Sequence, residues 1–204
     1  MTNATLLYSL TDRVALPSAR AIRVASVLFI TALTAAAAQV SIPLPFTPVP
    51  LTLQPMIVLL GAAALGSRLG VASQILYLAA GMAGLPVFAA SPGLPHGIAR
   101  LLGPTGGFLL SYPLAALATG LLAERGFDRR YVTSVAAMAA GLAIIFAGGV
   151  STLTLQLAPA MGSGALSAAL AAGFYPFVAA DLIKLLLAAA ILPGVWKLVG
   201  RRVS

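Results

Sequence analysis

The chain has 204 residues, of which 60% are hydrophobic and only 8% are charged, and its mean hydropathy is +1.04. A soluble domain of that size would lack the polar surface it needs, so the long apolar runs are predicted to be membrane spans. The net charge of +8 comes from short basic clusters between those runs, which excludes a nucleic-acid-binding stripe. The chain has no cysteine, which excludes disulfides, thiolate metal sites and cysteine catalysis.

Six apolar runs are predicted to be helices. They cover residues 22–40, 56–65, 71–85, 108–123, 131–150 and 174–192. Residues 151–172 are uncharged and predicted to be a partly helical connection, and Pro193 with Gly194 is predicted to close the last helix. We therefore expect an all-α polytopic membrane protein with six transmembrane helices in one membrane domain, residues 21–199.

The basic residues predict the orientation of these helices. If six helices alternate, ten basic residues fall on one side and only Arg100 falls on the other, which indicates that both termini are cytoplasmic. The ten are Arg13, Arg20, Arg23, Arg68, Arg125, Arg129, Arg130, Lys197, Arg201 and Arg202. A five-helix arrangement would place at least one basic cluster on the wrong side. Residues 1–20 lack the apolar stretch of a signal peptide, so residues 1–20 and 200–204 are expected to be cytoplasmic tails.

The first helix carries a ridge of small residues. Ala32 and Ala36 are four residues apart, with Thr31 and Ala35 beside them, and such a ridge allows another helix to approach closely. Alanine is abundant in this chain, so a chance ridge is an equal alternative.

Residues 41–55 contain five prolines and cannot form an uninterrupted helix. One interpretation is an extended connection that packs among the helices and brings Gln54 to a cavity, because irregular backbone at membrane depth must be buried or line a cavity. The other is an outer loop that leads into a proline-capped helix.

Residues 86–103 form a long connection that contains His96 and Arg100 and is interpreted either as a lid over a cavity or as a passive surface loop. The following segment, residues 103–107, is rich in glycine but lacks the Gly-Lys-[Ser/Thr] ending of a phosphate-binding loop. Its glycines are expected to allow close packing where the fourth helix begins.

Asp181 and Lys184 lie inside the last apolar run, three residues apart, and therefore on one face of the helix. Ionisable groups within a membrane are costly and usually mark a pair, a cavity or a substrate site. Two interpretations stand: a self-neutralising pair that fixes helix packing, and a buried site that recognises a polar ligand.

Enzyme chemistry is poorly supported by the residues available. Ser163 could be a nucleophile, but the only histidine, His96, lies in the outer loop, so a Ser–His dyad is not expected. A metal site is not expected either, because the chain has only four acidic residues and three of them fall on the cytoplasmic side. No sequence for binding ATP is present, so active transport would need a partner or an ion gradient.

The remaining hypothesis is a small-solute site open to the outside. Its expected polar groups are Asp181, Lys184, Arg100, Gln54, Tyr77, Thr105 and Tyr175, and its expected walls are Phe88, Phe108, Phe174, Tyr175 and Phe177. Two cations and one acid leave an excess of positive charge, which a ligand carboxylate would balance.

Several motifs give the chain a family resemblance. They are Ile42-Pro43-Leu44-Pro45-Phe46, Val49-Pro50-Leu51-Thr52-Leu53-Gln54, Gly84-Leu85-Pro86-Val87-Phe88, Leu102-Gly103-Pro104-Thr105-Gly106-Gly107-Phe108, and the Asp-x-x-Lys of residues 181–184. Together they resemble the BioY family, the biotin-specific S components of energy-coupling factor (ECF) transporters, from about Ala32 to Pro193. Residues 91–100 depart from the glycine-rich family pattern.

The resemblance implies a six-helix S-component fold in a bacterial cytoplasmic (inner) membrane that captures biotin from outside. It implies a transmembrane coupling protein and two ATPase subunits as partners, which alone would use ATP, while this chain would bind no cofactor. It also implies that Asp181 and Lys184 bind the ligand and that Ala32 and Ala36 face the coupling protein. The alternatives are an S component for another vitamin and a structural membrane subunit.

Overall fold

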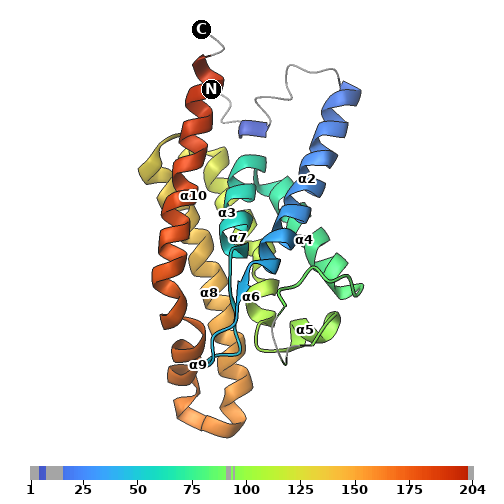
Figure 1. Ribbon diagram of the computed structural model, residues 1–204. Coiled ribbons are helices and arrows are strands. Elements are labelled where there is room, and N and C mark those ends of the chain that lie inside the picture. Colours follow the sequence, from blue (N-terminus) through green and yellow to red (C-terminus); the bar gives the residue numbers. More distant parts are fainter. Residues whose placement is uncertain (1–4, 8–15, 91–92, 94, 202–204) are drawn as a thin grey trace.

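The computed structural model describes residues 5–7, 16–90, 93 and 95–201. Most of this part of the chain is helical (Figure 1). The helices are α2 (Leu16–Gln39), α3 (Gln54–Leu65), α4 (Ser67–Met82), α5 (Ile98–Leu102), α6 (Gly106–Leu110), α7 (Tyr112–Glu124), α8 (Tyr131–Met161), α9 (Ala165–Gly173) and α10 (Tyr175–Arg201), with two 3-10 turns, η1 (Phe127–Arg129) and η2 (Gly162–Gly164).

Four helical stretches in the described residues are long and apolar enough to cross a membrane. They are Ser18–Gln39, Gly106–Glu124, Tyr131–Gly173 and Tyr175–Lys197, and the apolar helix Gln54–Leu65 is shorter. These stretches have the length and composition expected of the helices of a membrane protein.

The ends of two predicted helices differ from the structure. The fifth helix was predicted to end at Val150, but α8 continues to Met161. The next residue, Gly162, adopts a φ of +52° and begins the turn into α9. The prediction that Pro193 closes the last helix is wrong, since α10 runs on to Arg201. Trp196, one turn beyond that proline, donates a 2.6 Å hydrogen bond from Nε1 to Asp128 in η1, and this contact holds the end of α10 against the bundle.

Helix α3 lies at the centre of the bundle, where it contacts α2, α4, α7, α8 and α10. Its residues Val58, Leu59, Ala62 and Ala63 are almost completely buried. The short helix can occupy this position because small residues let neighbouring helices approach; a side chain at Gly70 of α4 would lie 3.0 Å from the backbone of Ala62.

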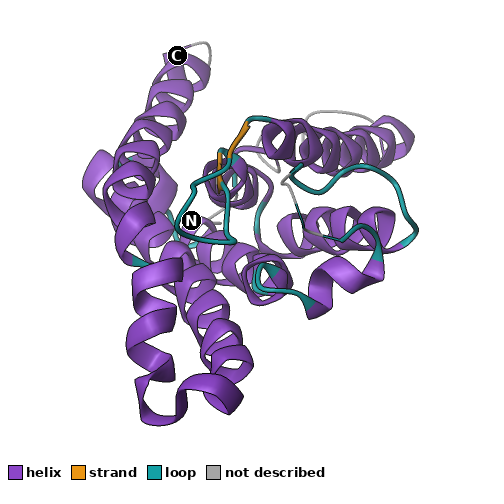
Figure 2. Cartoon of the chain, turned by 60° about the horizontal axis from the view of Figure 1, so that its bottom comes forward, coloured by secondary structure: helices purple, strands orange, loops and turns teal. Residues whose placement is uncertain are grey.

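The proline-rich connection before α3 contains the two strands of the structure's described part, β1 (Ser41–Ile42) and β2 (Leu51–Thr52), which pair antiparallel. The expectation of an all-α chain missed this small ribbon, which Figure 2 shows in orange among the helices. The loop between the strands is fixed by Thr47, whose hydroxyl donates a 2.6 Å hydrogen bond to the carbonyl of Ala172. Pro55 lies in the first turn of α3, so the connection is both an extended segment and a proline-capped helix start.

The predicted fourth helix is divided at Ser111 into α6 and α7. Glycines pack α6 directly against α8, as the sequence predicted: a Cβ at Gly107 would lie 2.3 Å from the carbonyl oxygen of Gly148, and a Cβ at Gly149 would lie 2.2 Å from the ring of Phe108. Since neither position can hold a side chain without movement, these contacts fix the position of Phe108.

Figure 1 shows the start of α2 and the end of α10 at the same end of the bundle, and α5 and α9 at the opposite end. Residues 1–4, 8–15 and 202–204 are not among the described residues, so the predicted tails lie partly outside them. Arg13 and Arg202, which support the predicted orientation, therefore also lie outside them.

Candidate functional site

A cavity opens between the proline-rich connection and helices α3, α5, α6, α7, α8 and α10. Its polar lining consists of Thr52, Gln54, Arg100, Thr105, Tyr112 and Asp181. Its apolar lining consists of Val49, Pro50, Leu51, Pro55, Ala89, Phe108, Leu109, Ile145, Phe146 and Phe177. A mostly apolar wall with a few placed polar groups is typical of a site for a small molecule.

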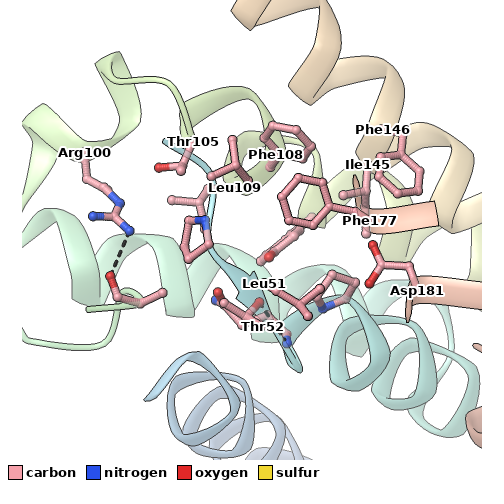
Figure 3. A pocket seen from close by; sticks show the side chains of 16 residues that line it. Leu51, Thr52, Arg100, Thr105, Phe108, Leu109, Ile145, Phe146, Phe177 and Asp181 are labelled. Carbon is pink, nitrogen blue, oxygen red and sulfur yellow. Dashed lines mark hydrogen bonds between the residues drawn. The ribbon is translucent and has the colours of Figure 1, made fainter. Parts of the chain in front are cut away.

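Asp181 reaches this cavity from α10. Phe177 lies one helical turn earlier on the same face and also lines the cavity, so the helix presents an aromatic ring and a carboxylate side by side. Figure 3 shows the Asp181 carboxylate at one end of the lining and Arg100 at the other, with Phe108 and Phe177 between them. Asp181 is only 7% exposed, so its charge needs a nearby partner.

That partner is Lys184, one turn further along α10. Its ammonium forms an ion pair with Asp181 and donates a 2.6 Å hydrogen bond to the carbonyl oxygen of Thr52. Lys184 itself does not line the cavity. It borders a small pocket against α3 and α8 and an apolar groove between α10 and the β1–β2 ribbon. The two members of the predicted pair therefore have different surroundings, because only the acid faces the cavity.

Arg100 forms the opposite end of the site from the short helix α5. Its side chain is buried, and Nη2 donates a 2.8 Å hydrogen bond to the carbonyl oxygen of Ala89. Nε of Arg100 and the hydroxyl of Thr105 are buried and have no hydrogen-bond partner among the described residues. Buried polar atoms in folded proteins are almost always paired, so this end of the cavity is suited to a ligand group that accepts hydrogen bonds.

Gln54 begins α3 and lines the cavity. Its Nε2 donates a 2.6 Å hydrogen bond to the hydroxyl of Tyr77, which in turn lies 3.2 Å from the carbonyl oxygen of Val87. Gln54 is 3% exposed and Tyr77 is completely buried, so the amide is held in one place. Tyr77 supports the wall from behind and does not line the cavity.

The comparisons with known proteins identify the family. Residues 9–201 match the model of the BioY family. The chain belongs to the BioY family. A Thermotoga maritima protein named biotin transporter BioY is 42% identical over 161 residues, which cover 79% of this chain and 88% of that protein. A Rhizobium etli protein of the same name is 31% identical over 175 residues, which cover 82% and 89% of the two chains.

The fold of this BioY-family chain also matches a solved structure. That structure is described as the S-component for biotin from an ECF-type ABC transporter. The match has a TM-score of 0.77 and covers 90% of this chain and 95% of the other, at 24% sequence identity. The likeness therefore confirms the expected S-component fold.

Not all residues predicted for the site line the cavity of this BioY-family chain. Asp181, Arg100, Gln54 and Thr105 do, together with the predicted walls Phe108 and Phe177. Tyr77, Phe88, Phe174, Tyr175 and Lys184 do not. Phe88 instead packs edge-on against Tyr77 with ring centroids 5.6 Å apart, and Tyr175 is 64% exposed at the start of α10.

Other lining residues were missed by the sequence analysis. Tyr112 follows Phe108 by four residues, so the helical period could have placed it on the same face. Phe146 and Ile145 lie in a uniformly apolar part of α8, where the sequence carries no signal that separates the cavity face from the lipid face. Phe174, predicted as a wall, contacts Phe146 from behind with ring centroids 5.0 Å apart.

Proposed function

We propose that this chain is the substrate-capture (S) component of an ECF-type uptake transporter and that it binds biotin in the cavity between Asp181 and Arg100. Two observations support the ligand: relatives that share 31% and 42% of their aligned residues with this chain are named biotin transporters, and the S-component for biotin has the same fold. The observation that carries the proposal is the separation of an acid and a cation by an apolar, aromatic wall.

Biotin has the matching arrangement of chemical groups. A ureido N–H group is a donor for the Asp181 carboxylate, and the bicyclic ring and aliphatic chain suit the wall of Phe108, Phe146 and Phe177. The carboxylate of biotin suits Arg100 and Thr105. Since Lys184 is already bound to Asp181 and Thr52, we assign the ligand carboxylate to Arg100. In this role Lys184 supplies the counter-charge of Asp181 and holds its carboxylate in place.

We further propose six membrane spans with both termini in the cytoplasm of a bacterial cell. The spans would be α2, α3, α4, α6 with α7, α8, and α10, in a bacterial cytoplasmic membrane, and α9 folds back against the end of α8. The basic residues support the proposal. Arg68 lies in the first turn of α4, Arg125 directly follows α7, and Lys197 lies near the end of α10, and these three helix ends lie on one side of the bundle. Arg100 belongs to α5 at the other end. The cavity then opens to the outside.

Delivery of biotin would require partners, since nothing in the sequence is suited to ATP. The proposed partners are a transmembrane coupling protein and two ATPase subunits. Ala32 and Ala36 are candidates for the docking face, because both are exposed on α2 while their neighbours Thr31 and Ala35 are half-buried.

Titration of the purified protein with biotin, thiamine and riboflavin in the absence of ATP tests the proposal. We expect saturable binding of biotin with a 1:1 stoichiometry and at least 100-fold weaker binding of the other two vitamins. Preferential binding of another vitamin would replace biotin as the ligand. Binding of none by a folded, monodisperse protein would favour a structural subunit.

A further inference from the structure

The hydroxyl of Tyr77 lies between two groups that determine the direction of its hydrogen bonds. Its oxygen is 3.2 Å from the carbonyl oxygen of Val87 and 2.6 Å from Nε2 of Gln54. A carbonyl oxygen can only accept, so the single hydroxyl hydrogen must point at Val87. The hydroxyl oxygen must then accept from Gln54, which requires the NH₂ group of the amide on that side.

The Tyr77 ring cannot adjust its position easily. It is completely buried, packs edge-on against Phe88 at 5.6 Å and lies 6.3 Å from the ring of Tyr112. Phe88 is itself fixed against α4, because a Cβ at Gly81 would lie only 2.1 Å from its ring. The hydroxyl is therefore a rigid acceptor for the amide of Gln54.

We infer that Tyr77 is a positioning residue that fixes the orientation of the Gln54 amide, so that the cavity presents an acceptor oxygen, and selects a ligand N–H donor, at this point. With the NH₂ group held by Tyr77, the oxygen Oε1 is the half of the amide that remains for a ligand. This inference rests on the proposed function: the ureido ring of biotin has two N–H groups, one for Asp181 and one for Gln54. A ligand with an oxygen at the second position would meet acceptor against acceptor.

Two cyclic carbamate analogues of biotin, each with a ring oxygen in place of one ureido N–H, test the inference. We expect the wild-type protein to bind each analogue about 100-fold more weakly than biotin, one penalty arising at Asp181 and the other at Gln54. In Tyr77→Phe the ring packing stays and the hydroxyl is lost, so the Gln54 amide can rotate and offer its NH₂ group. The loss of affinity relative to biotin should then fall below about 10-fold for one analogue and stay unchanged for the other.

A merely structural role for Tyr77 predicts a different pattern: biotin and both analogues would weaken by the same factor, and this result would overturn the inference. Gln54→Leu is the second variant, because it leaves the bond from Tyr77 to Val87 intact. It should abolish discrimination against the same analogue, and Tyr77→Phe added to it should change nothing more. Unchanged discrimination in Gln54→Leu would also overturn the inference. If the wild-type protein binds no biotin at all, the proposed function fails instead.

Discussion

Lys184 Nζ on α10 lies 2.6 Å from the carbonyl oxygen of Thr52, a residue 132 positions earlier in the chain. The same ammonium group forms an ion pair with Asp181. Thr52 and Asp181 both line the cavity, so one cation outside the cavity connects two parts of its wall. The pair therefore has a packing function in addition to the proposed binding function of its acid.

Replacement of this cation should destabilise the protein. In Lys184→Met, the buried Asp181 loses its counter-charge and the Thr52 carbonyl loses its donor. Removing one member of a buried ion pair costs about 3–5 kcal/mol, so we expect the thermal midpoint in detergent to fall by roughly 6–20 °C. In Asp181→Asn with Lys184→Met no unpaired charge remains, and much of the stability should return. Equal midpoints for the single and double variants would contradict this account of the pair.

Arg100 is predicted to bind the ligand carboxylate. Arg100→Met should weaken the binding of biotin by about 10-fold to 100-fold, because a charge-assisted hydrogen bond is lost. Biotin methyl ester, which has no negative charge, should lose much less affinity, and this difference is measurable by competition against labelled biotin. The exposed Arg68 provides a matched control, since Arg68→Met should leave both affinities unchanged. Equal losses for biotin and its ester would place the carboxylate elsewhere.

The glycines between α6 and α8 are predicted to be essential for packing. In Gly107→Ala the new methyl group would lie 2.3 Å from the carbonyl oxygen of Gly148 and 2.1 Å from Oγ1 of Thr152. Overpacking of this kind costs about 1–3 kcal/mol and should lower the thermal midpoint. Gly194→Ala is the control, because nothing lies within 4 Å of its Cβ position in α10. A midpoint for Gly107→Ala equal to that of the control would show that the two helices can separate without cost.

Asp128 should make stability depend on pH. This residue lies in η1, outside the membrane-spanning helices, and burial raises its pKa above the ordinary value of 3.8 although Trp196 donates a hydrogen bond to it. The folded state therefore binds the proton more tightly than the unfolded state, so stability is lost as the pH rises from about 3.8 through the raised pKa.

The variant Asp128→Asn isolates this effect because it keeps an acceptor oxygen for Trp196 but cannot ionise. It should be more stable than the wild-type protein at pH 7, and the difference in thermal midpoint should shrink as the pH approaches 4. A difference that stays constant across this range would mean that the charge of Asp128 is not responsible.

The sequence alone could predict the general architecture and the two ends of the site. Asp181 is predicted because an acid inside an apolar run is rare, and Arg100 because it is the basic residue that falls on the outer side. Helical geometry could have corrected one prediction: Phe177 precedes Asp181 by four residues and shares its face, whereas Tyr175 precedes it by six and points elsewhere.

Other features could not be predicted because they depend on tertiary contacts. The partner of Lys184 is a main-chain carbonyl, and any residue type can supply such a group. Tyr77 is polar and lies in an apolar helix, as a ligand-binding residue would, but its hydroxyl turns toward Gln54 and Val87 behind the wall. The end of α10 was also unpredictable, since its continuation past Pro193 accompanies contacts with η1.

The affinity of Asp181→Asn for biotin, measured by calorimetric titration beside the wild-type protein, tests the central claim most directly. The asparagine can offer one acceptor oxygen but no negative charge, so we predict that biotin binds at least about 10-fold more weakly to a variant that remains folded and monodisperse. An unchanged affinity in such a variant would contradict the claim that this carboxylate recognises the ligand, and Asp181 would then serve helix packing alone.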